Sequence, residues 1–138
     1  MYCLVCHNLI RISRLQELFA TRELLLCGRC QSQFKRKSPQ VLYEKNSWLE
    51  HVVDRLNQGD MCLIQIFVHD LYGAVLKHLN VTKEIIAIEK DASIPYPWLE
   101  ILVAEVKLKI PKKNLRGEEK LFISQDFSIE GKRHIKLF

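Results

Sequence analysis

Four of the five cysteines lie within the first thirty residues and form two closely spaced pairs. Cys3 pairs with Cys6 and Cys27 with Cys30, and twenty residues separate the two pairs. A gap of two residues lets both thiolates of a turn bind one ion, so two such turns supply four sulfur ligands arranged as a tetrahedron. This spacing is close to that of known zinc sites, and we predict a structural zinc ion bound by these four residues.

Two disulfides or four free thiols are the alternatives to a zinc site. Disulfides fit poorly, because nothing else in the sequence indicates a secreted protein. A redox role is not favoured, since no strand and helix of the kind that flanks redox motifs surrounds either pair. His7 follows Cys6, but four cysteines already complete the shell, so His7 is expected to be a surface residue or a hydrogen-bond partner. Cys62 lies in an apolar segment and is predicted to be a small core residue.

A basic run follows the second cysteine pair. Lys35, Arg36 and Lys37 are consecutive, and Arg29 lies between Cys27 and Cys30. Such residues could contact the phosphate backbone of a nucleic acid. Three basic residues just before a proline are also typical of a solvated linker, so both interpretations stay open.

The composition is that of a globular protein. The chain has 138 residues, of which 48% are hydrophobic and 27% charged, with a net charge of +5. No run of eighteen apolar residues occurs, so no membrane span is expected. The first residues lack a basic segment followed by an apolar run, and the paired thiols suit a reducing compartment. We therefore expect a cytoplasmic protein.

The sequence pattern predicts an α/β protein with two parts. Residues 1–38 form the metal module, Pro39 marks the boundary, and residues 39–138 form an α/β domain. In the second part a helix begins at the capping box of Ser47 and Glu50 and ends before Gly59. The further expected elements are a short strand at 41–44, a helix at 61–79, a buried strand at 84–89, a helix at 98–109, a strand at 121–123 and a helical turn at 128–131.

Three stretches carry a resemblance to a known family. They are the opening Cys3-Leu4-Val5-Cys6, the second pair within Leu26-Cys27-Gly28-Arg29-Cys30, and the segment from Tyr43 to Phe67 with its Gly59-Asp60. In these the chain resembles the ComF family, in particular its ComFC-like competence proteins, which are phosphoribosyltransferase-like. The resemblance implies a small zinc-ribbon-like module followed by a phosphoribosyltransferase-like α/β domain. It also implies a role in natural competence and DNA uptake, with single-stranded DNA or other competence proteins as partners.

The chain departs from the family pattern in two loops, one of which binds the substrate in family members. Family members carry a loop rich in Arg-Gly-Phe-Asn where this chain has residues 90–97, and they bind phosphoribosyl pyrophosphate (PRPP) on two acidic residues, two others and Thr-Thr-Gly. The sequence has neither Asp-Asp nor Thr-Thr-Gly. Such a loop supplies backbone N–H groups for a phosphate and carboxylates beside a magnesium-bound pyrophosphate.

We therefore expect an incomplete phosphoribosyltransferase-like domain, truncated before the PRPP-binding loop that would follow Phe138. No catalytic residue and no cofactor other than zinc is assigned, and no transferase turnover is expected. Two alternatives remain open. The chain could be a zinc-ribbon module that binds nucleic acid or protein without a role in competence, or a fragment of an intact phosphoribosyltransferase.

Overall fold

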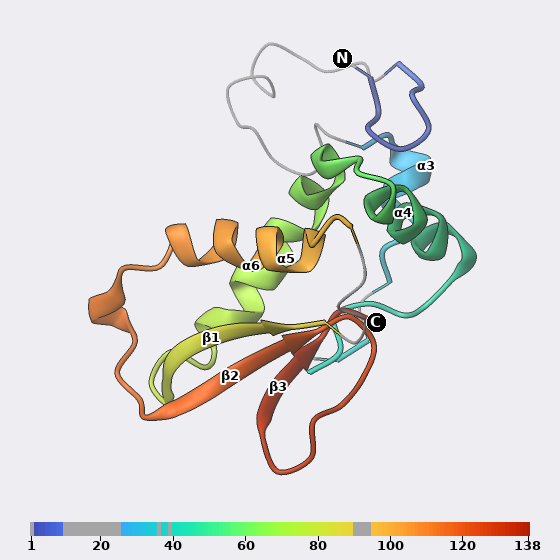
Figure 1. Cartoon of the computed structure of the whole chain (residues 1–138). Helices are drawn as coiled ribbons and strands as arrows, with labels where there is room; N and C mark the ends of the chain where they lie inside the picture. Colours follow the sequence, from blue (N-terminus) through green and yellow to red (C-terminus); the bar gives the residue numbers. More distant parts are fainter. Residues whose placement is uncertain (1, 10–25, 36, 39, 90–94) are drawn as a thin grey trace.

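A three-stranded parallel sheet forms the base of the structure, and helices pack on one of its faces (Figure 1). The computed structural model describes residues 2–9, 26–35, 37–38, 40–89 and 95–138. The elements in chain order are α3 (Gly28–Gln31), α4 (Ser47–Asn57), the 3-10 helix η1 (Met61–Ile64), α5 (Gln65–Leu76), β1 (Thr82–Ile88), α6 (Trp98–Leu108), the 3-10 helix η2 (Lys112–Asn114), β2 (Glu119–Ser124) and β3 (Arg133–Lys136).

The strand order is β1-β2-β3, and both pairs of neighbours are parallel. Helix α6 connects β1 to β2, as a crossover between parallel strands requires. In the register Ile123 lies opposite Ala87 on one side and Ile135 on the other. Beyond β3, the backbone N–H of Leu42 donates to the carbonyl of Lys136 at 3.0 Å, and Val41 forms a parallel bridge with Lys136. The segment before α4 therefore extends the sheet at its far edge.

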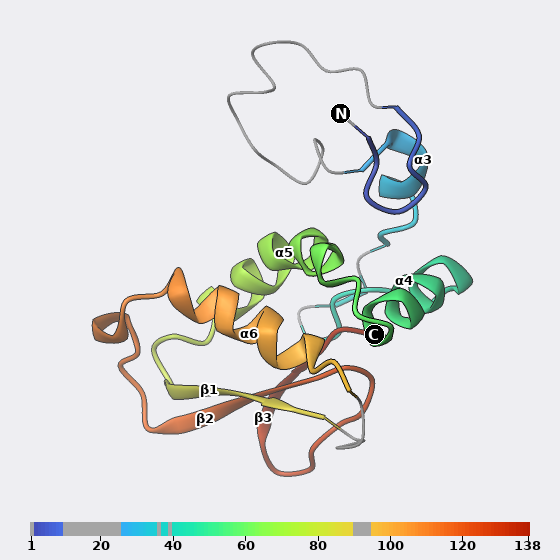
Figure 2. The ribbon, with the colours of Figure 1, turned by 45° about the horizontal axis from the view of Figure 1, so that its top comes forward.

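Helices α5 and α6 cover the same face of the sheet, as two views agree (Figure 1, Figure 2). The helical spacing of Leu99, Leu102, Val103 and Val106 predicts one apolar face for the helix at 98–109, and the structure confirms it, since all four are buried in α6. In the part of the chain that the structure describes, no helix packs on the opposite face. The predicted strand at 84–89 is confirmed as β1, Thr82–Ile88, but the expectation that it is buried on both faces is wrong for this reason. Strand β1 is an edge strand with helices on one side only, and Glu84 is exposed.

A cluster of aromatic rings joins the chain after the cysteine pairs to the helices. The Phe34 ring lies 4.9 Å from Tyr43, 5.0 Å from Trp48 and 5.9 Å from Phe67, measured between ring centroids. Phe67 on α5 also contacts Trp98 at 6.5 Å. The buried residues of the metal module and of the α/β part form a single hydrophobic cluster. The predicted boundary near residue 39 stays a prediction.

The start of α4 differs from the predicted capping box. The N-cap is Asn46, whose side-chain oxygen accepts the backbone N–H of Leu49 at 2.8 Å, and Ser47 is the first helical residue. The Asn46 amide also donates to the carbonyl of Gln33 at 2.9 Å, which fixes this residue beside the metal module. The predicted end of the helix is confirmed: Gly59 has a φ of 101°, and a Cβ there would lie 3.0 Å from the Tyr96 ring.

Other sequence-based expectations also change. The predicted helix at 61–79 is a 3-10 turn followed by α5, and residues 128–131 form a turn rather than a helix, with Gly131 at a φ of 69°. Cys62 is exposed and not a core residue, because it lies on the outer side of η1. Among the described helices, none has both the length and the apolar character needed to cross a bilayer.

Candidate metal centre

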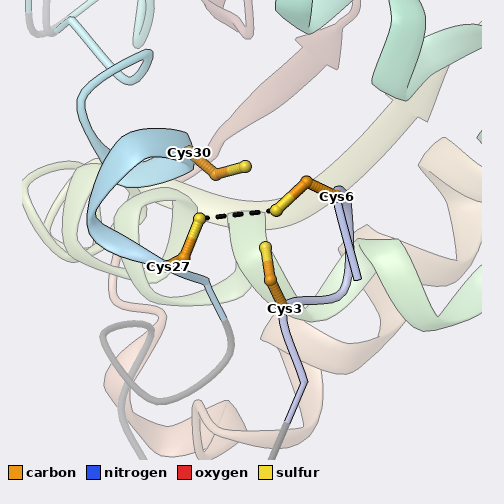
Figure 3. A group of neighbouring side chains, drawn as sticks. All are labelled: Cys3, Cys6, Cys27 and Cys30. Carbon is orange, nitrogen blue, oxygen red and sulfur yellow. Dashed lines mark hydrogen bonds between the residues drawn. The ribbon is translucent and has the colours of Figure 1, made fainter. Parts of the chain in front are cut away.

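The four paired cysteines meet in space. Their Sγ atoms all lie within 4.8 Å of one another, and those of Cys6 and Cys27 are 3.5 Å apart. Figure 3 shows Cys3 and Cys6 on the first loop facing Cys27 and Cys30 at the start of α3. Four Zn–S bonds of about 2.3 Å in a tetrahedron place sulfurs about 3.8 Å apart, so small side-chain shifts would complete the shell. The site is therefore positioned to hold a metal ion.

A tight turn presents the first pair. The backbone N–H of His7 donates to the carbonyl of Cys3 at 3.0 Å, and the N–H of Cys3 donates to the carbonyl of Asn8 at 2.8 Å. His7 adopts a φ of 63°, which turns the chain back so that Tyr2 and Leu9 form an antiparallel bridge. His7 is exposed and lies outside the group of four sulfurs, in agreement with its predicted role as a surface residue.

The second pair is held by the first turn of α3. Cys27 is the N-cap residue, and its carbonyl accepts the N–H of Gln31 at 3.0 Å. The Gln31 side chain also donates to the carbonyl of Leu26 at 3.0 Å, so the chain on both sides of Cys27 is fixed. Cys30 is buried on the inner side of this turn, and Leu26 is fully buried beneath the pair.

The two buried thiols, Cys3 and Cys30, do not ionise alike. Burial opposes ionisation of Cys3, but backbone N–H groups of Cys27, Cys6 and Val5 outweigh it and lower the pKa of Cys3 to about 6. At Cys30 burial, together with the neighbouring thiols, raises the pKa well above its usual range. Crowded thiols in a partly buried site thus resist carrying four negative charges. A bound dication supplies the compensating charge and holds all four as thiolates.

The donor set limits what such a site can do. Tetrahedral sulfur coordination suits zinc or iron among the common metals. Four protein ligands close the shell and leave no position for water or substrate, so a metal held here would serve a structural purpose. Cys6 is exposed whereas Cys3 and Cys30 are buried, so the ion has an entry path on the Cys6 side.

Arg55 of α4 connects this site to the rest of the chain, a contact that sequence reasoning missed. Its guanidinium donates to the carbonyl of Val5 at 2.8 Å and to that of Leu4 at 3.2 Å. The same group forms an ion pair with Asp60 at 2.5 Å. Asp60 is the N-cap residue of η1, but its carboxylate binds Arg55 and makes no capping hydrogen bond. In the sequence, only the short spacing of Arg55 and Asp60 could indicate an ion pair. The carbonyls of Leu4 and Val5 lie about fifty residues away, so no local pattern indicates their contact with Arg55.

Three of the four predicted nucleic-acid contacts lie among the described residues, and all three are exposed. Arg29 is exposed on α3, and Lys35 and Lys37 are exposed on the turn that follows. This turn is ordered by backbone hydrogen bonds from Glu44 to Lys35 and from Lys37 to the carbonyl of Leu42. Arg36 lies outside the described residues, and the role of all four stays a prediction.

Comparisons with protein-family models, with curated proteins and with solved structures gave no significant match.

Proposed function

We propose that the cysteine cluster is a structural zinc centre and that it folds the N-terminal module onto the α/β part of the chain. One observation carries the proposal: the four Sγ atoms converge within 4.8 Å although twenty residues separate the two pairs. Zinc is preferred because the shell is closed and the thiol pairs have the spacing of known zinc sites.

The energetics favour a metal in this place. The described parts of the module contribute few large buried side chains, chiefly Val5 and Leu26 beside the cysteines. Structural zinc in small domains contributes about 10–16 kcal/mol of apparent binding free energy, which here would offset the entropy of ordering the module. The ion would also hold the carbonyls of Leu4 and Val5 where Arg55 can bind them.

Metal analysis of the purified protein tests this proposal. We expect one zinc per chain in the wild type and loss of zinc in Cys27→Ser. The matched control is Cys62→Ser, which changes an exposed thiol outside the cluster and should keep one zinc. Iron in place of zinc, a metal-free wild type, or equal metal loss in both variants would overturn the proposal.

We further propose that the chain acts in natural competence and DNA uptake as a ComF-like protein in the cytoplasm. Its two cysteine pairs and the segment from Tyr43 to Phe67 support this, because they carry the resemblance. A parallel sheet with a helical crossover is compatible with a phosphoribosyltransferase-like domain. In this role the chain contacts single-stranded DNA or other competence proteins, and no transferase turnover is assigned to these residues. A nucleic-acid or protein interaction module without a role in competence is the alternative.

Two measurements address this role. In the organism that encodes the chain, deletion should lower the yield of natural transformants and leave electroporation unchanged. Equal yields by natural transformation with and without the gene would refute the competence role and favour the alternative module. Calorimetry with PRPP and magnesium should show no binding, and tight magnesium-dependent binding would contradict the non-enzymatic assignment.

A further inference from the structure

The end of the molecule remote from the cysteine cluster gathers much of the positive charge. In Figure 1 the amino ends of β1 and β2 lie near the turn that follows α6, away from α3. The helical elements and their ends contribute five exposed lysines: Lys77, Lys107, Lys109, Lys112 and Lys113. The strand starts and the turns before them contribute five more exposed cations: Lys83, Arg116, Lys120, Lys132 and Arg133. We call these ten residues the basic edge.

The topology brings these residues together. Parallel strands place their amino ends at one edge of the sheet, so Lys83, Lys120 and Arg133 enter it from neighbouring strands. The segment after η2 packs on the start of β1 and the turn before it: the N–H of Gly117 donates to the carbonyl of Thr82 at 3.2 Å, and that of Arg116 to the carbonyl of Leu79 at 3.1 Å. Gly117 permits this contact, because a Cβ there would lie only 1.7 Å from the Val81 backbone.

The charges of the basic edge are largely uncompensated. Four glutamates lie among its residues, at positions 84, 118, 119 and 130, which leaves an excess of six positive charges where the whole chain carries +5. Among the residues that the structure describes, only Arg133 of the ten forms an ion pair, with Glu119 at 2.8 Å. Like charges gathered in this way repel one another, and an anionic partner would relieve the repulsion.

Two hollows at the basic edge provide room for such a partner. One, of about 610 Å³, lies between β1, α6 and the following turn, and Lys83, Lys107 and Lys112 line it. The other, of about 400 Å³, is lined by four cations and two glutamates, with the half-buried Phe122 in its wall; they are Lys83, Lys120, Lys132, Arg133, Glu118 and Glu119. Both are lined by Lys83, so they adjoin at the start of β1.

We propose that the basic edge binds the phosphate backbone of single-stranded nucleic acid, which would run past Lys83 through both hollows. The inference rests on the proposed contact with single-stranded DNA and assigns it to this surface rather than to Arg29 and the basic run at 35–37. Cations on several elements beside a recess fit an extended polyanion that follows a groove. A flat anionic membrane is the competing partner, since Leu108 is 83% exposed beside Lys107 and Lys109.

A pair of matched variants tests the assignment. The first replaces Lys83, Lys107, Lys112 and Lys132 by glutamine, and the second replaces Arg29, Lys35, Arg36 and Lys37 by glutamine. Both lower the net charge from +5 to +1 and differ only in where the charge is removed. Binding of a fluorescent oligothymidylate is measured against salt concentration, with circular dichroism as a check that each variant is folded.

The first variant should lower the slope of log affinity against log salt by about 3, since each phosphate contact to a single strand contributes about 0.7. At about 0.1 M salt this corresponds to a loss of affinity of roughly a few hundredfold. The second variant should bind nearly as the wild type does. An equal loss in both variants, or a larger loss in the second, would overturn the assignment while DNA contact itself survived.

Two further outcomes concern the binding of oligothymidylate and of lipid vesicles by the wild-type protein. No binding of oligothymidylate at low salt would overturn both the inference and the proposed DNA contact, whereas the zinc content would still report on the metal centre separately. Binding to vesicles with anionic lipid, weakened by Leu108→Gln and unmatched by any binding of oligothymidylate, would assign the basic edge to a membrane and overturn the proposal.

Discussion

The metal module and the α/β part of the chain are stabilised in different ways. In the described segments of the module, the cysteines account for two of the four buried hydrophobic residues, and Cys3 and Cys30 are the two. The α/β part buries two helices against a sheet and closes an aromatic cluster around Phe67. A small segment cannot bury enough apolar surface to order itself, so it needs a cross-link, whereas the larger part gains its stability from packing. We therefore expect some changes to unfold or weaken one part of the chain and to leave the other part folded.

Removal of the metal should have the largest effect, and the module alone should show it. A high-affinity chelator at neutral pH should abolish amide protection at residues 2–9 and 26–34, because about 10–16 kcal/mol of binding free energy is lost. Protection in α5, β1 and β2 should persist. Hydrogen exchange followed by mass spectrometry measures both. Cooperative unfolding of the entire chain on chelation would show that the two parts do not differ in this way.

Truncation of Phe67 should produce the reverse pattern. The side chain is fully buried and its ring lies 5.8 Å from Tyr43 and 6.3 Å from Phe138. Phe67→Ala should lower the free energy of unfolding by about 3–5 kcal/mol in urea titrations, with one metal per chain retained in the folded state. Phe122→Ala, at a half-buried position on the uncovered face of the sheet, is the control and should cost less. Similar losses in the two variants would argue against a core centred on Phe67.

The contact between the two parts depends on Arg55. Arg55→Gln leaves the Leu4 and Val5 carbonyls and the Asp60 carboxylate without their donor, at a cost of about 1–3 kcal/mol. The cysteine ligands are unchanged, so the metal should stay bound while limited proteolysis between the module and α4 becomes faster. Arg133→Gln removes an exposed pair with Glu119 and should cost no more than about 1 kcal/mol. Unchanged proteolysis in Arg55→Gln would mean that the other contacts, the shared apolar cluster and the hydrogen bond from Asn46 to Gln33, hold the two parts together without Arg55.

The smallest expected effect is a pH dependence of the free energy of unfolding, and it arises in the α/β part only. Burial, with Arg133 and Lys77 nearby, lowers the pKa of His78 below its ordinary value of 6.5. A histidine with a depressed pKa favours the folded state while neutral, so its contribution is complete above pH 6.5 and is lost as the pH falls through the folded-state pKa. The free energy of unfolding of the wild type, compared with His78→Gln, should therefore decline below pH 6.5. His69→Gln, at an exposed site on α5, controls for loss of an imidazole. If the difference in free energy of unfolding between the wild type and His78→Gln did not change with pH, this assignment would be contradicted.

Much of the fold could be predicted where the determinants are local. The spacing of Leu99, Leu102, Val103 and Val106 predicts the buried face of α6, and the structure confirms it. The start of α4 was misplaced by one residue because Ser47 is as good a cap as Asn46 in sequence terms, and only the contact with Gln33 decides between them. Strand β3 was missed, since its short apolar alternation is too weak a signal without the neighbouring strand.

The sequence by itself identified the four cysteines that are positioned to hold a metal ion, because a gap of two residues lets both thiols of each pair face one ion. It also determined α4 and α6 to within a residue or two at their ends, because helical hydrogen bonds and apolar faces are set over a few residues. Only the tertiary structure decided that the pairs converge within 4.8 Å, that Arg55 reaches carbonyls fifty residues away, and that cations from all three strands and from the helical elements share one edge of the sheet. These features depend on strand order and chain crossings, which arise from contacts between distant residues and leave no periodic trace in the sequence.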